Sequence, residues 1–439
     1  MKNFKFLSIL ALIFVLAFAL VACSGEKNET TETTQAEETQ PTAETTDETV
    51  AETAGETTAE TEAETNEETS TEPEKTSPFE NKTKPENVTF EQCFPAPTVD
   101  KRQATYDYMM KMAKIEWTPS VDFVTTHRPD VDRDYTVNLE YKAGKTYYGI
   151  CYGETKAAYD LFMDHIKDGK LTCDSYYYQD IIGNHCSSCM FLAYQQIIPV
   201  GYGTLRPSTA RKGIFKLAGD LENPGDGTWY SKDCFALNGQ EAVYEAYTTL
   251  DKGDILFKCI PGSGHTRFVT KVEISKTVAG KLNPSRSYVY VIENTNTWLD
   301  GNKNTTWWVD KKYTFAKLWE TEFMPITLDT YFDDNDKVWD AYIWFTGNNT
   351  PEQITSKLTG KISSNFPLNY MSIVIEDANG NVVKKHLKNN LENTFEIDLF
   401  RESFGLKLSE LPAGTYKYTL KAGIARGAST IESFEFTVK

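Results

Sequence analysis

The chain has 439 residues with 63 acidic and 45 basic side chains, which gives a formal net charge of -18. This length predicts at least two folded units, because single domains cluster near 100 to 200 residues. Residues 24–85 hold 18 of the acidic and four of the basic side chains, so residues 86–439 carry a net charge of only -6. No basic stripe remains, which excludes a nucleic-acid-binding protein. An aromatic content of 13% excludes a wholly disordered chain.

The first 23 residues have the pattern of an export signal. Lys2 and Lys5 precede an apolar run over residues 6–20. This run is short for a membrane-spanning helix, which needs about 20 apolar residues. Residues 20–23 read Leu-Val-Ala-Cys and resemble the lipobox of bacterial lipoproteins, which implies that Cys23 carries a diacylglycerol anchor. We therefore expect an extracytoplasmic protein that is lipid-anchored to the bacterial cell membrane and faces the cell wall.

Residues 24–85 are rich in Glu, Thr and Ala and contain no aromatic residue before Phe79. Such a segment cannot bury enough apolar surface to offset its chain entropy. We expect a disordered acidic tether that holds the folded part near the membrane.

Residues 86–347 are predicted to form an α+β domain. Apolar spacing of three and four residues predicts helices over 101–114, 154–167 and 186–197, the last stopped by Pro199. Strand patterns follow at residues 254–259, 266–274 and 288–293. Helices first and antiparallel strands later are typical of an α+β domain.

Residues 348–439 are predicted to form a small β-sandwich of the immunoglobulin-like type. Short alternating segments lie at residues 370–376, 393–399, 415–421 and 433–438. Turn residues separate them, including Asn379-Gly380.

Eight cysteines raise the questions of disulfides and metals. Export permits disulfides. If Cys23 is lipidated and one thiol is catalytic, the remaining six allow 15 pairings, and the sequence does not choose among them. Cys173, His185, Cys186 and Cys189 lie near one another in sequence, but no second spaced pair completes a zinc site. We expect no metal and no cofactor.

Three predicted elements each present one reactive side chain at an end. Cys186 lies where a loop enters the third helix, so the positive end of the helix dipole favours its thiolate. His265 opens the second predicted strand, and Glu293 ends the third. A thiolate that attacks a carbonyl, an imidazole that carries the proton and a polar group that orients the imidazole are the parts of a cysteine peptidase.

The sequence resembles the NlpC family of papain-like cell-wall peptidases, including divergent Gram-positive members. The matching segments are Cys-Ser-Ser at 186–188, Gly-Asp-Ile at 253–255 before His265, and Gly-Ile-Cys-Tyr at 149–152, and the resemblance covers about residues 100 to 327. It implies a papain-like NlpC-type domain that hydrolyses bonds in peptidoglycan stem peptides, possibly a γ-D-glutamyl bond.

By the same resemblance, Cys186 is the nucleophile, His265 the base, Glu293 the orienting residue and Tyr152 a supporting hydroxyl near the developing oxyanion. The chain departs from the family pattern in three respects, one of which is a Cys186-to-His265 spacing longer than in compact members. Cys151 stands where the family has proline, and His185 precedes the cysteine where an Asp or Asn is usual.

Two neighbouring residues are alternatives for these roles. Cys189 is a rival nucleophile, because residues 186–189 also resemble the papain signature, but one helical turn deeper it should face the core. Asn294 is the alternative orienting residue, although strand alternation directs it away from Glu293's side.

Two other functions compete with the peptidase. One is a thiol oxidoreductase that uses Cys186 and Cys189, although no thioredoxin-like pattern surrounds them. The other is a non-catalytic cell-wall-binding lipoprotein, in which Trp298, Trp307 and Trp308 would form a stacking surface.

Overall fold

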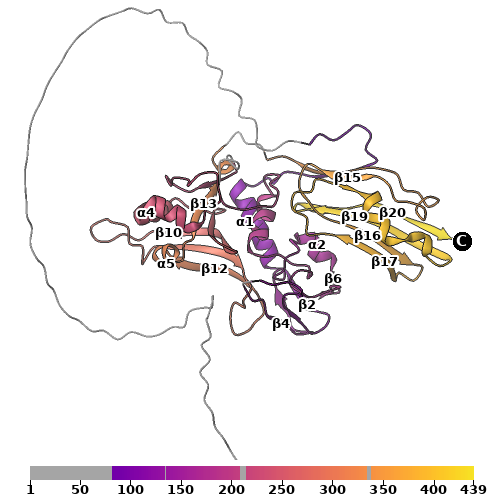
Figure 1. Cartoon of the computed structure of the whole chain (residues 1–439), viewed down its shortest axis with the longest axis horizontal. Helices are drawn as coiled ribbons and strands as arrows, with labels where there is room; N and C mark the ends of the chain where they lie inside the picture. The colour runs from indigo at the N-terminus through magenta and orange to yellow at the C-terminus, as the bar shows by residue number, and fades with distance from the viewer. Residues whose placement is uncertain (1–81, 134, 208–213, 334–337) are drawn as a thin grey trace, which may run out of the picture. The chain divides into compact units, whose positions relative to one another are not determined.

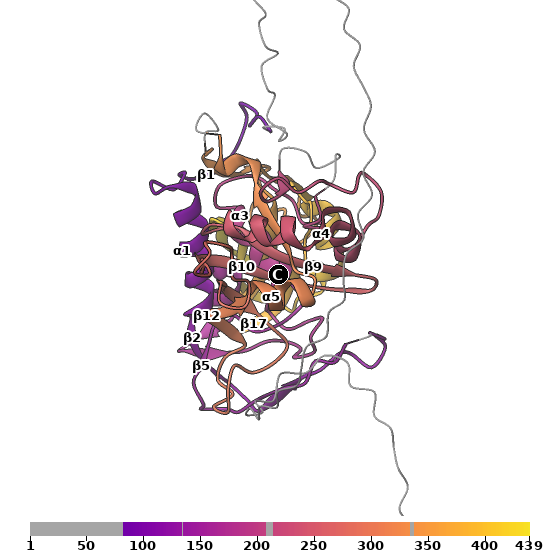
Figure 2. The same cartoon turned by 90° about the vertical axis from the view of Figure 1, so that its left-hand side faces the viewer.

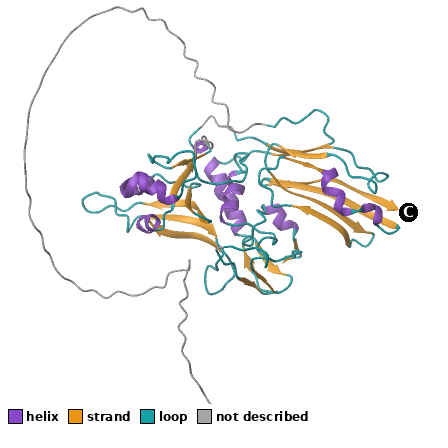
Figure 3. Cartoon of the chain, in the orientation of Figure 1, coloured by secondary structure: helices purple, strands orange, loops and turns teal. Residues whose placement is uncertain are grey.

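The computed structural model describes residues 82–133, 135–207, 214–333 and 338–439. The predicted export signal, Cys23 and the tether up to residue 81 lie outside the described residues. Within the described ranges, no helix combines the length and the apolar character that crossing a membrane requires. Strands outnumber helices and pair mostly antiparallel, so the predicted α+β class is confirmed (Figure 3).

A six-stranded antiparallel sheet forms the centre of the first region. Its spatial order is β12 (Trp307–Thr314), β11 (Tyr288–Asn294), β10 (Ser263–Glu273), β9 (Ile255–Ile260), β13 (Met324–Leu328) and β8 (Phe215–Leu217). β9, β10 and β11 correspond to the three strands predicted from the sequence, each within three residues at either end. The prediction succeeded here because buried strands keep a strong apolar pattern.

Helices pack on this sheet, as Figures 1 and 2 show. α3 (Cys186–Tyr194) contacts β10 and β11, and α1 (Lys101–Ala113) packs against α3. α4 (Ser231–Thr248) contacts β9 and β13, while α5 (Phe315–Glu320) contacts α4 and β12. Every residue of α3 except Ser187 is buried, which makes it a core helix that is apolar on all sides.

The predicted helix over 154–167 is wrong in its first half. The helix α2 covers only Tyr159–Asp164. The preceding residues make long-range contacts instead: the Thr155 hydroxyl donates to the carbonyl of Ile181 at 2.9 Å, and Ala157 N-H donates to the carbonyl of Gly183 at 2.8 Å. These tertiary hydrogen bonds override the local helical pattern. The predicted third helix also ends early, at Tyr194, and α4 was not predicted.

Short strands and packed aromatic side chains hold together the loops that follow α1 in the chain. The strands are β2 (Glu116–Pro119), β3 (Phe123–Thr125), β4 (Leu139–Tyr141), β5 (Tyr147–Tyr148), β6 (Ile166–Lys167) and β7 (Lys170–Leu171). The rings of Trp117 and Tyr147 stack with centroids 5.3 Å apart. The Trp117 indole donates to the carbonyl of Gly149 and the Trp307 indole to that of Ile150, each at 2.8 Å.

Two four-stranded antiparallel sheets form the second region. One has the order β1 (Phe90–Phe94), β14 (Ala341–Thr346), β15 (Lys361–Ser364) and β18 (Glu396–Asp398), and the other β17 (Val382–Lys388), β16 (Leu368–Asp377), β19 (Gly414–Ile424) and β20 (Gly427–Val438). Short helices follow β18, namely α6 (Leu399–Ser403), η3 (Phe404–Leu406) and η4 (Leu408–Glu410), while η2 (Asp329–Tyr331) follows β13 in the first region. We call the paired sheets the two-sheet region.

A single hydrophobic core joins both sheets, as in a β-sandwich. β1 and β14 belong to this core, although the predicted boundary at residue 348 assigned both strands to the first domain. Turn chemistry supports the β16–β17 hairpin, where Gly380 has a φ of 81°.

The backbone at Gly149 lies very close to the buried ring of Trp307. It has a φ of +80°, and a Cβ there would lie 2.1 Å from Cδ1 of Trp307. Gly144 has a similar φ of +76° but nothing within 4 Å of the corresponding position. We predict that Gly144→Ala lowers the free energy of unfolding by about 1 kcal/mol, the cost of the left-handed backbone alone.

Gly149→Ala should cost about 2 kcal/mol more, because the ring of Trp307 must also move. Urea unfolding followed by tryptophan fluorescence measures both variants. Equal losses for the two variants would mean that the close approach to Trp307 contributes nothing.

Candidate active site

Cys186 is the first residue of α3, and the loop before it is held by paired backbones. Asn184 N-H donates to the carbonyl of Cys151 at 2.9 Å, and Gly153 N-H donates to the carbonyl of Asn184 at 3.2 Å. A Cβ on Gly183 would lie 2.5 Å from the carbonyl oxygen of Cys151, so the close approach needs glycine. The loop therefore delivers Cys186 to the positive end of the helix dipole.

Ser188 fixes the start of the helix. The backbone N-H of His185 donates to Ser188 Oγ at 2.8 Å, and that hydroxyl donates to the carbonyl of His185 at 2.9 Å. His185 itself has extended backbone angles, as an N-cap residue requires. The reciprocal bonds hold the backbone on both sides of Cys186.

The structure brings Cys186, His265 and Glu293 together. Cys186 and His265 are close electrostatic neighbours, and each shifts the pKa of the other. The Nε2 atom of His265 lies 2.7 Å from Oε2 of Glu293. Because Nε2 is engaged by Glu293, Nδ1 is the ring nitrogen that remains for Cys186. The three side chains form a chain from sulfur through imidazole to carboxylate.

Glu293 is only 2% exposed, yet it is surrounded by donors. Arg267 Nε donates to Oε2 at 3.1 Å, the Tyr313 hydroxyl donates to Oε1 at 2.5 Å, and Lys311 Nζ lies 3.7 Å from Oε1. Burial alone would raise the pKa of this carboxyl, but His265, Arg267 and Tyr313 hold it well below its usual range. Glu293 is therefore a fixed negative charge.

The pKa values of the Cys186 and His265 side chains move in opposite directions. Burial alone would raise the pKa of the Cys186 thiol, but His265 and His185 beside it hold that pKa well below its usual value. Burial alone would lower the pKa of His265, but Cys186 and then Glu293 raise it to about 9. Both shifts favour the thiolate–imidazolium form of the pair, which is the reactive form of a catalytic cysteine.

Cys189 and Asn294 lie outside this chain. Cys189 Sγ donates to Asn184 Oδ1 at 2.9 Å, and burial raises the pKa of Cys189 well above its usual value. Asn294 Nδ2 donates to the carbonyl oxygen of Asn184 at 2.9 Å, and Asn294 Oδ1 accepts from Thr306 at 2.8 Å. Both residues hydrogen-bond to Asn184 and so stabilise the loop before Cys186. Neighbouring strand residues face opposite ways, which explains why Asn294 points away from His265.

Tyr152 lies beside Cys186, as the resemblance implied. Burial, followed by the nearby Cys186 sulfur, raises the pKa of Tyr152 well above its usual value. Its ring stacks on Tyr178 with centroids 5.4 Å apart, and Tyr178 meets Tyr135 edge-on at 6.2 Å. Sequence analysis missed Tyr135 and Tyr178, because they come from loops without a motif.

A second polar group lies next to Cys186 and was also missed. The Tyr202 hydroxyl lies 3.2 Å from His185 Nε2 and 3.0 Å from Ser187 Oγ. The ammonium group of Lys156 lies 4.7 Å from the centre of the Tyr202 ring, and Tyr202 N-H donates to the carbonyl of Glu392 at 3.0 Å. The Tyr202 hydroxyl thereby orients the ring of His185. His185 stands at the position where the resemblance leads us to expect Asp or Asn.

The two-sheet region supports this group directly. Asn369 of β16 accepts from Ala158 N-H at 2.9 Å and donates to the carbonyl of Lys156 at 2.7 Å. Lys156 has a φ of 55°, which is unfavourable for a side-chain-bearing residue, and its ammonium bonds Asn390. The loop after β17 therefore helps to hold a strained residue beside the candidate active site.

The remaining cysteines are free thiols in the described residues. No group of three or more His, Cys, Asp or Glu side chains suited to a metal ion occurs in the ranges that the structure describes. Burial raises the pKa of Cys151 well above its usual value and that of Cys173 to about 11. These two thiols are therefore poor nucleophiles at neutral pH.

Comparisons of the chain with protein-family models, with curated proteins and with solved structures gave no significant match.

The thiol pKa differences predict selective alkylation. At pH 6, iodoacetamide should modify Cys186 while leaving Cys189 and Cys151 unmodified, because only Cys186 has a substantial thiolate fraction there. Peptide mapping by mass spectrometry after timed quenching measures the rate at each cysteine.

His265→Ala is the informative variant, since it removes the neighbour that contributes most to lowering the Cys186 pKa. Once that pKa has risen above 6, each further unit should slow alkylation at pH 6 about tenfold. Faster labelling of Cys189, or an unchanged rate in His265→Ala, would contradict this assignment of the reactive thiol.

Proposed function

We propose that this protein is a cysteine peptidase of the papain-like NlpC type that hydrolyses peptide or amide bonds in peptidoglycan stem peptides. The observation that carries the proposal is that His265 lies beside Cys186 and is hydrogen-bonded to the buried carboxylate of Glu293. A buried carboxylate that holds an imidazole against a low-pKa thiol is costly to maintain, and nucleophilic catalysis explains why the fold contains it.

The reaction follows from the protonation states. The Cys186 thiolate attacks the carbonyl carbon of the scissile bond and forms a tetrahedral oxyanion. The His265 imidazolium donates its proton to the leaving nitrogen, the C-N bond breaks, and a thioester remains on the sulfur. Water then gives a proton to neutral His265 while its oxygen attacks the thioester. Expulsion of the thiolate restores the resting pair and releases a carboxylic acid.

Other groups would assist without exchanging protons. Glu293 accepts a hydrogen bond from the Nε2-H group of His265. This bond keeps Nδ1 directed at the sulfur whether the ring is neutral or charged. The start of α3 leaves the backbone N-H of Cys186 without an intrahelical partner, so it can donate to the oxyanion. The Tyr152 hydroxyl is the second candidate donor.

The substrate class rests on location and resemblance. The lipobox-like segment ending at Cys23 and the acidic tether predict a protein held at the outer side of the cell membrane, where peptidoglycan is the abundant peptide-bearing polymer. The segments at 149–152, 186–188 and 253–255 resemble those of cell-wall peptidases.

The geometry disfavours the two competing functions. A thiol oxidoreductase needs a second reactive thiol, but Cys189 is fully buried and bonded to Asn184. A stacking surface of three tryptophans is incomplete, because Trp307 is 2% exposed and belongs to the core. Trp298 packs edge-on against Tyr141 with centroids 5.1 Å apart.

A digestion assay tests the proposed activity. Purified full-length protein should release new amino termini from peptidoglycan, measured by fluorescent amine labelling and mass spectrometry. Cys186→Ala should abolish the release, whereas Cys189→Ala, the matched cysteine one helical turn deeper, should retain it. Release that persists in Cys186→Ala, or no release by the wild type, would overturn the proposal.

Variants at Glu293 test how the imidazole is oriented. Glu293→Ala should reduce turnover by up to about 10⁴-fold, the scale of losses when a triad imidazole is misoriented. Glu293→Gln should retain more activity, because its amide oxygen still accepts from His265 and its NH₂ group can donate to the Tyr313 hydroxyl. His265→Ala should be the most damaging of the three, since it also removes the proton carrier.

The pH profile separates orientation from general damage. The raised His265 pKa means that the imidazolium persists at neutral pH and is lost as the pH rises through about 9, so wild-type turnover should fall above that pH. Glu293→Gln should move this alkaline limb to lower pH, because the carboxylate no longer stabilises the imidazolium.

Asn294→Ala provides the contrast. It should lower thermal stability by releasing the loop at Asn184 but leave the alkaline limb in place. An unchanged limb in Glu293→Gln, together with a shifted limb in Asn294→Ala, would show that Asn294 is the orienting residue.

A further inference from the structure

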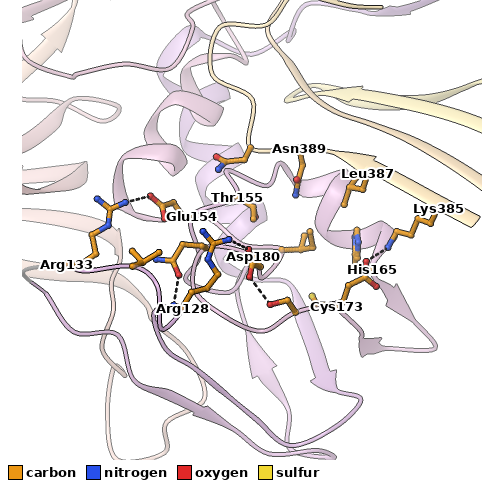
Figure 4. Close-up of a pocket in the computed structure, with 16 residues that line it drawn as sticks. Arg128, Arg133, Glu154, Thr155, His165, Cys173, Asp180, Lys385, Leu387 and Asn389 are labelled. Carbon is orange, nitrogen blue, oxygen red and sulfur yellow. Dashed lines mark hydrogen bonds and ion pairs between the residues drawn. The ribbon is translucent and has the colours of Figure 1, made fainter. Parts of the chain in front are cut away.

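A cavity of about 630 Å³ lies where the first region meets strand β17 and the loop after it (Figure 4). One side is lined by Arg128, Val131, Arg133, Glu154, Thr155, His165, Cys173, Asp174, Ser175, Gln179, Asp180 and Ile182. Lys385 and Leu387 of β17, followed by Asn389 and Asn390, line the other. Cys186 does not line the cavity, so this is a separate site formed by both regions of the chain.

The wall of the cavity is continuous with the active-site loop. Thr155 lines the cavity, and its hydroxyl oxygen accepts from the backbone N-H of Gly183 at 2.9 Å. Ile182 also lines it and precedes Cys186 by four residues. Four residues of chain span at most about 14 Å. The Cα atom of Ile182, on the cavity wall, therefore lies within that distance of the Cα atom of Cys186.

One tyrosine connects the cavity with the nucleophile. Glu154 on the cavity wall, Arg133 and Cys186 are all electrostatic neighbours of the Tyr135 hydroxyl. Tyr135 also contacts Tyr178 edge-on, and Tyr178 stacks on Tyr152 beside Cys186. These packed rings connect the wall of the cavity with the surroundings of the sulfur, so a peptide could reach both.

Three cations line the cavity, and each already pairs with a carboxylate. Arg128 NH1 lies 3.2 Å from Asp180, Arg133 NH2 lies 3.2 Å from Glu154, and Lys385 Nζ lies 3.1 Å from Asp174.

These pairs leave some of the charged donors unused. An arginine has five N-H groups and a lysine three, and the bond to Glu154 uses only one of those on Arg133. Asp180 accepts at both oxygens, from Arg128 at 3.2 Å and from Ser175 at 2.9 Å. Arg133 and Lys385 therefore keep charged N-H groups that their partners do not use. Such groups can donate to an incoming carboxylate.

We propose that this cavity is a substrate subsite that binds a free carboxylate of an acidic peptide, within four residues of the bond cleaved at Cys186. The proposal rests on the proposed peptidase function. Arg133 supplies the main donor, because its side chain is 44% exposed and lies nearest to Tyr135 along the chain. Lys385 supplies a second donor from β17, so the two-sheet region takes part in recognition.

Binding to the full-length Cys186→Ala protein tests the proposal, with two acidic tetrapeptides as probes that differ only in a glutamate carboxylate or carboxamide. Isothermal titration calorimetry should show that the carboxylate peptide binds about tenfold more tightly, the scale of a charge-assisted hydrogen bond. Arg133→Gln and Lys385→Gln, each added to Cys186→Ala, should reduce that preference. Glu154→Gln should preserve it.

Lys388→Gln is the matched control. Lys388 lies on the same strand as Lys385 and pairs with Glu402, and neither residue lines the cavity. Its substitution should leave the preference unchanged. Thermal unfolding of each variant checks that the fold survives, as expected for exposed ion pairs.

Several results would overturn the subsite: no measurable binding, equal binding of the two peptides, or a preference that Arg133→Gln and Lys385→Gln leave intact. Failure of the subsite and failure of the peptidase are distinguishable. Carboxylate-selective binding without release of amino termini by the wild type would keep the subsite and refute hydrolysis. Hydrolysis by the wild type without carboxylate preference would refute the subsite alone.

Discussion

The buried carboxylate of Glu293 is the constraint on which the candidate site depends. A charge that is 2% exposed is tolerable only where donors surround it, and here an imidazole, a guanidinium and a phenol all donate to it. Those bonds fix the ring of His265, and the ring in turn lowers the pKa of Cys186. Removing the carboxylate would therefore affect orientation and charge together.

Backbone pairing between residues 151–153 and 183–184 positions Cys186 and Tyr152. The segment at 151–153 lies against Gly183 and Asn184, which places Tyr152 beside Cys186 and delivers Cys186 to the start of α3. The same segment continues into Lys156, which Asn369 of the two-sheet region holds in a left-handed conformation. Both regions therefore contribute to one site, and separating them at residue 348 would cut strands from the second core.

The sequence predicted the chemical parts of the site better than its surroundings. Cys186 at a helix start, His265 at a strand start and Glu293 at a strand end were recognisable because each follows or precedes a strong apolar pattern. The helix over 154–167 was mispredicted, because the hydrogen bonds of Thr155 and Ala157 run to residues 26 to 28 positions away. No local pattern reports such distant partners.

The sequence by itself determined the α+β class, the core strands, and the placement of Cys186 at the start of the helix with Cys189 one turn deeper. Periodicity carries that information, since it depends only on which face of an element is apolar. Only the tertiary structure decided that Tyr202 orients His185, and that Arg133 and Lys385 border one cavity. These residues are up to 252 positions apart. Their meeting depends on how the two regions pack, which neither periodicity nor spacing encodes.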